Sequence, residues 1–198
     1  GDEEFLDRVP EDTGGTTVVA THVADHDNRP KVPEGYLFMD DLIEADGTSE
    51  LEEKPKQGRI IIMSSGTTGI PKGVLRNEPK TPATLGAVTD RIPWRRNMVI
   101  LQSASMFHAW GWANVIIAMV TGATLVTQRE FEPKRALELM DEYGVNGLVS
   151  AAIFLRILND YLDENPRPNP GPFEFMVSSG NAIPAWLVTA LTKRFGPV

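Results

Sequence analysis

The sequence predicts an α/β fold in which a largely parallel β-sheet is flanked by helices. Strand-like and helix-like patterns alternate from residue 98 onward in the 198-residue chain, and this alternation is typical of a parallel sheet whose strands are joined through helices. An apolar run at residues 60–62 leads directly into a segment rich in glycine, serine and threonine at residues 63–74. Hydrophobic residues make up 41% and charged residues 23% of the chain, the proportions of an ordinary globular protein.

The elements expected in the first 64 residues are short. Residues 4–9 predict a brief helix that ends at Pro10. The β-branched residues 16–22 predict a strand, and the apolar positions in residues 36–44 predict a short amphipathic helix. Residues 59–64 have the pattern of a buried strand that runs into the glycine-rich segment.

Beyond the glycine-rich segment, the expected elements alternate more regularly. The expected strands are residues 98–103, 123–127, 147–150 and 173–178. The expected helices are residues 83–92, 110–120, 133–143, 153–162 and 184–195. The helix at 133–143 is the best marked, because it has a proline in its first turn and Gly144 at its end. The helix at 110–120 is apolar on so many sides that we expect it to be buried.

Composition excludes several classes of protein. The chain contains no cysteine, which excludes disulfides, thiolate metal sites and a cysteine nucleophile. No apolar run reaches the length of a membrane span, and the acidic first residues lack the apolar core of a signal peptide. We therefore expect a cytoplasmic enzyme or a part of one, without a membrane span, for which peripheral membrane contact stays open.

The charge of the chain is unevenly distributed. The net charge of −8 argues against general nucleic-acid binding. Residues 1–60 carry 16 acidic and 6 basic side chains, whereas residues 61–198 carry 11 acidic and 13 basic ones. The part with the glycine-rich segment is therefore the part that does not repel an anion, although a solvated acidic surface explains residues 1–60 equally simply.

The glycine-rich segment has the chemistry of a phosphate-binding loop. Small residues let the backbone approach a polyphosphate closely, where N–H groups and hydroxyls donate hydrogen bonds and Lys72 adds a positive charge. It is not a Walker A loop, because Pro71 and Gly73 flank the lysine. Composition alone leaves a surface turn as an equal alternative.

The order of residues decides between these interpretations. Residues 64–74, Ser-Ser-Gly-Thr-Thr-Gly-Ile-Pro-Lys-Gly-Val, closely resemble the signature phosphate loop of the adenylate-forming (AMP-binding) enzymes. These include acyl-CoA synthetases, firefly luciferase and the adenylation domains of peptide synthetases. Within this superfamily the chain is most similar to a bacterial fatty-acyl-CoA ligase, and the resemblance implies part of the large N-terminal domain of such an enzyme.

Two further segments follow in the order that this family expects. Residues 106–111, Met-Phe-His-Ala-Trp-Gly, resemble the motif beside the acyl site, although His108 alone would be interpreted as a strand-end histidine and Trp110 as core packing. Residues 178–183, Ser-Ser-Gly-Asn-Ala-Ile, resemble the segment that lies against the adenine and the acyl pocket. Asn181 and Ile183 depart from the residues that are commoner there.

The resemblance implies a two-step ligase that uses ATP, Mg²⁺ and coenzyme A. A carboxylate displaces pyrophosphate from ATP to form an acyl-adenylate, and a thiol then takes the acyl group. The positions that match the family's nucleotide-binding loop are Ser64, Ser65, Gly66, Thr67, Thr68, Gly69 and Lys72, with Thr67 close to the metal. His108 is implied as the catalytic residue near the carboxylate. The implied substrate-binding residues are Trp110, Gly180, Asn181 and Ala182.

The same resemblance predicts the extent of the domain. Residues 1–198 are expected to be a partial AMP-binding domain, with an acidic leading segment at 1–58 and the phosphate-loop and acyl-site segment at 59–198. The remainder of the N-terminal domain and the C-terminal domain are expected elsewhere in a longer protein, and the segment alone is expected to be inactive.

Two alternative functions remain open from the sequence. One is a fatty acyl-AMP ligase, which passes the acyl group to a carrier protein. The other is a non-catalytic module that binds a nucleotide or phosphate. Two minor clusters are also interpreted as surface features. His22 and His26 are interpreted as part of a solvated loop instead of a metal site. Trp94, among three arginines, is interpreted as part of a solvated helix end, in preference to a nucleotide-stacking residue or a membrane-facing edge.

Overall fold

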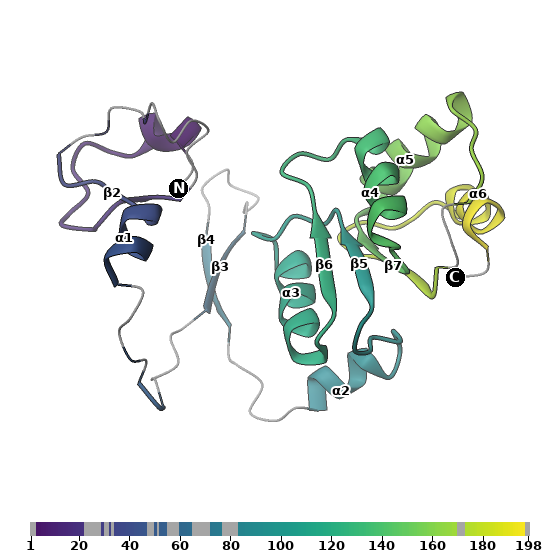
Figure 1. The fold of residues 1–198 in the computed structure, drawn as a ribbon, viewed down its shortest axis with the longest axis horizontal. Helices are drawn as coiled ribbons and strands as arrows, with labels where there is room; N and C mark the ends of the chain where they lie inside the picture. Colours follow the sequence, from purple (N-terminus) through teal and green to yellow (C-terminus); the bar gives the residue numbers. More distant parts are fainter. Residues whose placement is uncertain are drawn as a thin grey trace. The chain divides into compact units, whose positions relative to one another are not determined.

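The computed structural model describes residues 3–21, 29, 32, 34–46, 50, 52–54, 60–64, 72–76, 83–169 and 173–196 (Figure 1). The chain divides into two compact units, residues 1–58 and 59–198. Each unit is described by itself. His22 and His26 lie outside the described residues, so the interpretation of these histidines stays a prediction.

The unit at residues 1–58 contains little regular structure. It consists of a 3₁₀ helix η1 (Glu3–Arg8), two short parallel strands β1 (Val19–Ala20) and β2 (Leu37–Phe38), and helix α1 (Met39–Asp46). The expected strand at 16–22 is thus reduced to two residues, and the expected helix at 36–44 begins only at Met39. Leu37 and Phe38 are instead recruited into pairing with β1, which overrides the local helical pattern.

An antiparallel hairpin contains the ends of the glycine-rich segment. Strand β3 (Ile60–Ser64) pairs with β4 (Lys72–Arg76), and Ser64 lies opposite Lys72 in the register. At Ile61 the expectation of a buried strand was wrong, because this residue is 59% exposed and its cross-strand partner Leu75 is 51% exposed. An apolar run reveals a strand but not what covers it.

The second unit also contains a four-stranded, all-parallel sheet with the strand order β6-β5-β7-β8. Its strands are β5 (Val99–Gln102), β6 (Thr124–Thr127), β7 (Gly147–Ser150) and β8 (Phe175–Ser178). The helices are α2 (Ala83–Thr89), α3 (Ala109–Thr121), α4 (Pro133–Tyr143), α5 (Ala152–Glu164) and α6 (Ala185–Phe195). The predicted α/β class with a largely parallel sheet is confirmed.

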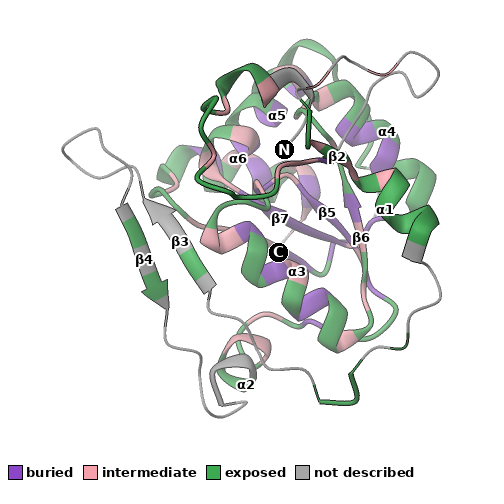
Figure 2. Ribbon diagram, turned by 90° about the vertical axis from the view of Figure 1, so that its left-hand side faces the viewer, coloured by how far each residue is buried: buried purple, intermediate pink, exposed green. Residues whose placement is uncertain are grey.

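The sheet separates two hydrophobic clusters, because successive residues of a strand point to opposite faces. Leu101 and Leu148 pack with α4, α5 and α6 on one face. Ile100 and Val149 pack with α3 and with Phe175 on the other. Figure 2 shows the buried residues concentrated in the strands of this sheet and on the helix sides that adjoin it.

Helix α4 illustrates why the sequence folds locally as it does. Pro133 opens the helix and Gly144 ends it with a left-handed φ of 61°, which glycine adopts at little cost. Leu137 and Met140 lie on its buried side. Full burial of a side chain of this kind stabilises the fold by about 1.5–3 kcal/mol.

Helix α3 and Trp94 differ from their predicted environments. Only one side of α3 is buried, while Met119 is 74% and Val120 62% exposed, so the expectation of a fully buried helix was wrong. Trp94 is 6% exposed and packs against Phe175 with the ring centroids 5.5 Å apart. It is therefore a core residue and not part of a solvated helix end. No helix in the described ranges is both long and apolar enough to cross a membrane.

Candidate active site at the carboxyl edge of the sheet

The strands β5, β7 and β8 each lead into a serine at the carboxyl edge of the sheet. Ser150 ends β7 and lies opposite Ser178, which ends β8, while Ser103 directly follows β5. The Oγ atoms of Ser103 and Ser150 are 2.7 Å apart. Ser103 and Ser150 were not singled out from the sequence, although the predicted strands 98–103 and 147–150 both end in serine, as does the strand 173–178 that leads into the motif at 178–183. That shared ending is the signal that would have found them.

The chain leaves β5 and β7 in opposite directions along the sheet: β5 is followed by β6 on one side, and β7 is followed by β8 on the other. Helix α3, which follows β5, packs on one face of the sheet, whereas α5, which follows β7, packs on the other (Figure 1). The two connections therefore diverge above the ends of two neighbouring strands. In open α/β sheets, ligands bind in the crevice at such a switch point, and Ser103 and Ser150 lie there.

The segment that connects β5 to α3 is tied to β7. The N–H groups of Ser103 and Ala104 donate to the carbonyl oxygen of Val149 at 2.9 and 3.4 Å. The indole Nε1 of Trp110 donates to the carbonyl oxygen of Ser150 at 3.0 Å. Trp110 is thus fixed beside the switch point, next to the strand that borders β8.

Within this segment, Gly111 has no room for a side chain. A Cβ atom at this position would lie 2.1 Å from the carbonyl oxygen of Ser105. The first turn of α3 therefore packs directly against the backbone of the segment that it follows. Only glycine allows so close an approach.

His108 is exposed immediately before α3 and occupies its N-cap position. Its side chain makes no capping hydrogen bond, while its backbone N–H donates to the carbonyl oxygen of Ser105 at 3.2 Å. The imidazole lies against the ring of Phe107 with a centroid distance of 4.4 Å. Phe107 is itself 81% exposed. The ring of His108 therefore lies at the outside of the fold and does not cap the helix.

The segment after β8 is more open. Gly180 is exposed with a left-handed φ of 98°, and a Cβ atom added to it would have no neighbouring atom within 4 Å. Asn181 and Ala182 are also exposed, while Ile183 packs against the cluster beneath α5 and α6. The Oγ atom of Ser178 is buried and has no hydrogen-bond partner in the described part of the chain.

The structure thus brings some predicted site residues to one edge and leaves others undescribed. Trp110 reaches Ser150, whose register partner Ser178 begins the segment that contains Gly180. Ser64 and Lys72 lie opposite each other as the paired ends of the hairpin. Residues 65–71, which hold the rest of the predicted nucleotide-binding positions, fall outside the described ranges.

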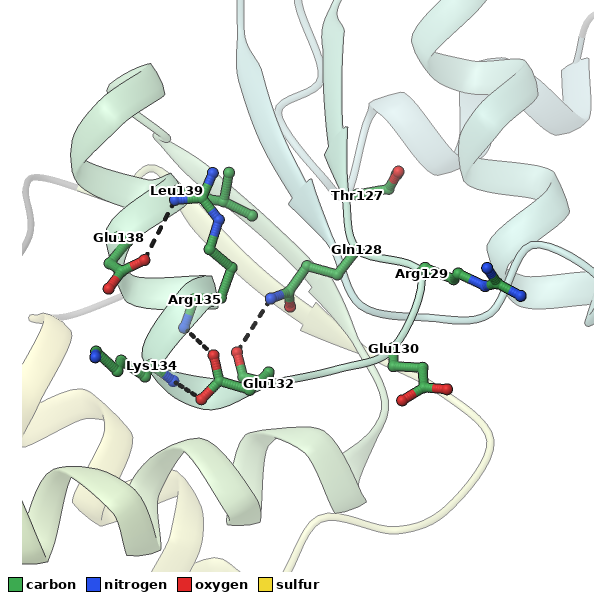
Figure 3. Close-up of a pocket in the computed structure, with 9 residues that line it drawn as sticks. All are labelled: Thr127, Gln128, Arg129, Glu130, Glu132, Lys134, Arg135, Glu138 and Leu139. Carbon is green, nitrogen blue, oxygen red and sulfur yellow. Dashed lines mark hydrogen bonds and ion pairs between the residues drawn. The ribbon is translucent and has the colours of Figure 1, made fainter. Parts of the chain in front are cut away.

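A shallow depression of about 600 Å³ lies where β6 is followed by α4 (Figure 3). Its lining residues are Thr127, Gln128, Arg129, Glu130, Glu132, Lys134, Arg135, Glu138 and Leu139. The Glu132 carboxylate accepts hydrogen bonds from the backbone N–H groups of Lys134 and Arg135 at 3.2 and 2.6 Å. These N–H groups at the N-terminus of α4 therefore already have a carboxylate as their hydrogen-bond acceptor.

The cationic side chains of this depression are balanced by acidic ones. Arg135 contacts Glu138 at 3.2 Å and Glu142 at 3.1 Å. The pKa of Arg135 is raised above its ordinary value, chiefly by the hydrogen bond to Glu138. Since three of the lining residues are acidic and three are basic, the depression does not have the charge of an anion site.

No group of three or more His, Cys, Asp or Glu side chains that could hold a metal ion occurs among the described residues. A protein-only metal cage is therefore not a feature of the described ranges. The predicted metal-binding position, Thr67, is outside them.

The chain is similar to known enzymes over nearly its whole length. The family model described as "AMP-binding enzyme" matches residues 2–198. A human mitochondrial malonate–CoA ligase is 35% identical over 142 residues, covering 65% of this chain and 25% of the relative. A 4-coumarate–CoA ligase of Arabidopsis thaliana is 33% identical over 170 residues, covering 82% of this chain and 30% of the relative.

Solved structures show the same fold. The inhibitor-bound N-terminal domain of FACL13 from Mycobacterium tuberculosis has a TM-score of 0.65 at 22% identity, covering 86% of this chain and 44% of that one. A fatty acyl CoA synthetase from the same organism has a TM-score of 0.64 at 20% identity, with 89% and 38% covered.

The chain spans about a quarter of the length of the first curated relatives that it matches. The match to the family nevertheless extends over nearly every residue of the chain and includes the hairpin, the sheet and its carboxyl edge. The chain therefore belongs to the AMP-binding enzyme family.

Proposed function

We propose that this chain supplies the nucleotide loop and the carboxylate-site edge of an ATP-dependent carboxylate–CoA ligase. The family match over residues 2–198 carries this proposal. It is supported by curated relatives at 33–35% identity that are named as CoA ligases for coumarate and for malonate. The proposal concerns the whole gene product, since the chain corresponds to a minority of each relative's length.

In the first step, a carboxylate oxygen of the substrate attacks the α-phosphorus of ATP, and the bond to pyrophosphate breaks. In the second step, the sulfur of coenzyme A attacks the acyl carbonyl, the thiol proton is released, and AMP leaves. Both steps depend on alignment of the reactants and on stabilisation of developing charge. The protein's task is therefore largely one of positioning.

The nucleotide loop is proposed to hold the phosphates. The hydroxyls and N–H groups of residues 64–69 would donate to phosphate oxygens, and Lys72 would add a positive charge. The pairing of Ser64 with Lys72 supports this role, because it holds both ends of the loop at one end of a hairpin. The net charge of residues 61–198, with 11 acidic and 13 basic side chains, leaves that part open to an anion.

A magnesium ion fits the donors available in this loop. The hydroxyl oxygen of Thr67 is a hard ligand of the kind that Mg²⁺ takes together with phosphate oxygens. When bound, the ion neutralises part of the phosphate charge. The described residues offer no competing cage of carboxylates or histidines.

The carboxyl edge of the sheet is proposed to receive the carboxylate substrate. His108 is exposed and uncommitted to helix capping, so its imidazole can approach a carboxylate. Trp110 is held in place by Ser150 and would form one wall of the acyl site. Gly180, Asn181 and Ala182 are proposed to line the adenine side of the site, where their exposed backbone leaves room for a ligand.

Fatty acids are the acyl class that we propose first, because the sequence as a whole most resembles a bacterial fatty-acyl-CoA ligase. Coumarate and malonate, named for the relatives, belong in the same substrate panel. Carboxylate-dependent exchange of pyrophosphate into ATP reports the first step alone. Formation of acyl-CoA reports both steps and separates a CoA ligase from an enzyme that releases or transfers the adenylate elsewhere.

Loop variants test the assignment directly. Lys72→Ala and Thr67→Ala are expected to lower exchange by about 100-fold, the scale of losing one charge-stabilising group. Lys193→Ala, at the exposed end of α6, serves as the control and should leave exchange unchanged. Full exchange activity in both loop variants would refute the proposed role of the loop.

A further inference from the structure

Gln102 is a buried amide at the end of the central strand β5. Its side chain is 3% exposed. One atom, Nε2, donates to the carbonyl oxygens of Ala104 at 3.2 Å and Gly111 at 3.3 Å. A single amide therefore joins the beginning of the segment at residues 104–111 to its end.

A second buried amide acts on the neighbouring carbonyl. Asn114 is 0% exposed, and its Nδ2 donates to the carbonyl oxygen of Trp110 at 2.7 Å. Two consecutive carbonyls in the first turn of α3, those of Trp110 and Gly111, thus each accept a hydrogen bond from a buried side chain. Together the two side-chain amides hold the first turn of α3 in place.

We call Gln102 and the two carbonyls that it joins the clasp. The backbone around the clasp is tightly packed. Gly111 lies so close to Ser105 that a Cβ atom would fall 2.1 Å from its carbonyl oxygen. A shift of the helix toward the segment would press the backbone of Gly111, which already lies close to Ser105, against its carbonyl oxygen. A shift away from the segment breaks the hydrogen bond of Gln102, so the distance is held from both sides.

Core packing alone does not account for these amides. The carbonyl oxygens Oε1 of Gln102 and Oδ1 of Asn114 are buried without a hydrogen-bond partner among the described residues. Leaving such an oxygen unpaired opposes folding. An apolar side chain of similar size would avoid this cost, and it would lose the donor that spans the segment.

We propose that Gln102 is a positioning residue of the ligase, which fixes residues 105–110 so that His108 and Trp110 face the carboxylate substrate. This inference rests on the proposed function. Gln102 acts through the segment and does not itself touch the substrate. The segment is positioned by the N–H donor group of Gln102 and not by the volume of its side chain.

The structural part of the proposal is tested by amide hydrogen exchange in the whole gene product. Gln102→Met keeps the volume and removes both donated hydrogen bonds. The matched control is Gln128→Met, because Gln128 follows the adjacent strand β6 and its Nε2 likewise donates to a loop carbonyl, that of Glu132, at 3.1 Å. Exchange at the amides of His108 and Trp112 is expected to become at least about tenfold faster in Gln102→Met only.

The functional part is tested by steady-state pyrophosphate exchange on the same proteins. Gln102→Met is expected to lower kcat/KM for the carboxylate by about 10- to 100-fold, since misplaced reacting groups cost this much. The KM for ATP should change by less than about twofold, because the described hydrogen bonds of Gln102 go to the segment at residues 104–111. A general loss of folding would alter both substrates alike.

Gln102→Glu provides a readout that packing cannot mimic. Its protonated carboxyl can donate one hydrogen bond, whereas the ionised form directs charge at two carbonyl oxygens. The folded-state pKa of this glutamate would therefore be raised, and activity should recover as the pH falls from about 8 to about 6. Gln128→Glu should show no such recovery.

The outcomes separate this inference from the function on which it rests. Equal exchange rates and equal kinetics in Gln102→Met and Gln128→Met would overturn the positioning role. Faster exchange with unaltered carboxylate kinetics would overturn it as well. If the wild-type protein adenylates no carboxylate in the panel, the proposed function fails, and the hydrogen-exchange comparison still decides whether Gln102 holds the segment.

Discussion

The segments that follow β5 and β8 occupy the same edge of the sheet, but they are held very differently. The segment after β5 is joined to β7 through Ser103 and Trp110 and to α3 through Gln102. The segment after β8 begins with a serine whose buried hydroxyl has no partner among the described residues and continues through exposed Gly180. One side of the candidate site is therefore built rigidly into the fold, and the other is open.

The largest expected contrast comes from the two glycines. Gly111→Ala places a Cβ against backbone atoms that cannot rotate away, and it should lower the free energy of unfolding by about 3 kcal/mol. Gly180→Ala meets no neighbouring atom and should cost only about 1 kcal/mol, from its positive φ. Urea denaturation measures both. Equal costs would show that the segment after β5 yields as easily as the one after β8.

An intermediate contrast compares two tryptophans. Trp110→Phe removes the hydrogen bond to Ser150 and part of the packed ring, and should cost about 2 kcal/mol. Trp186→Phe, on the exposed side of α6, should change stability by less than about 0.5 kcal/mol. Thermal unfolding of the two variants tests this difference. If Trp110→Phe left the unfolding temperature unchanged, the hydrogen bond from the indole to Ser150 would not stabilise the segment after β5.

The smallest contrast concerns the row of serines. Ser150→Ala removes the partner of Ser103 and should cost about 1 kcal/mol. Ser178→Ala removes a buried oxygen without a described partner and should be neutral or slightly stabilising. Denaturant midpoints are sufficient for this comparison. A destabilising Ser178→Ala would show that its hydroxyl is satisfied in solution.

Much of the parallel sheet was predictable because its signals are local. Helix α4 and strand β7 agree with prediction at both ends, since a proline, a glycine and a short apolar run mark them in the sequence. The order of neighbouring residues also singled out His108 and Trp110, which the structure places at the start of α3, and their roles in the site stay predictions.

Other features depend on contacts that a local pattern does not contain. To predict the hydrogen bonds of Gln102, one must know that Gly111 lies next to the end of β5. To predict the row of serines, one must know the order of the strands in the sheet. Helix α3 looked buried because it is apolar on many sides, yet Met119 and Val120 are exposed. Trp94 looked like a surface residue among arginines and is buried against Phe175. In each case tertiary packing decided what composition could not.

The strand order also has a consequence for how the site is assembled. The clasp joins Gln102 to a residue 9 positions away, whereas the Ser103–Ser150 contact closes a separation of 47 residues. For a flexible chain, this difference in length adds about 1.5 kcal/mol of closure entropy. The β5 segment can thus acquire its shape locally, and the contact between Ser103 and Ser150 at the switch point forms only when β7 takes its place next to β5.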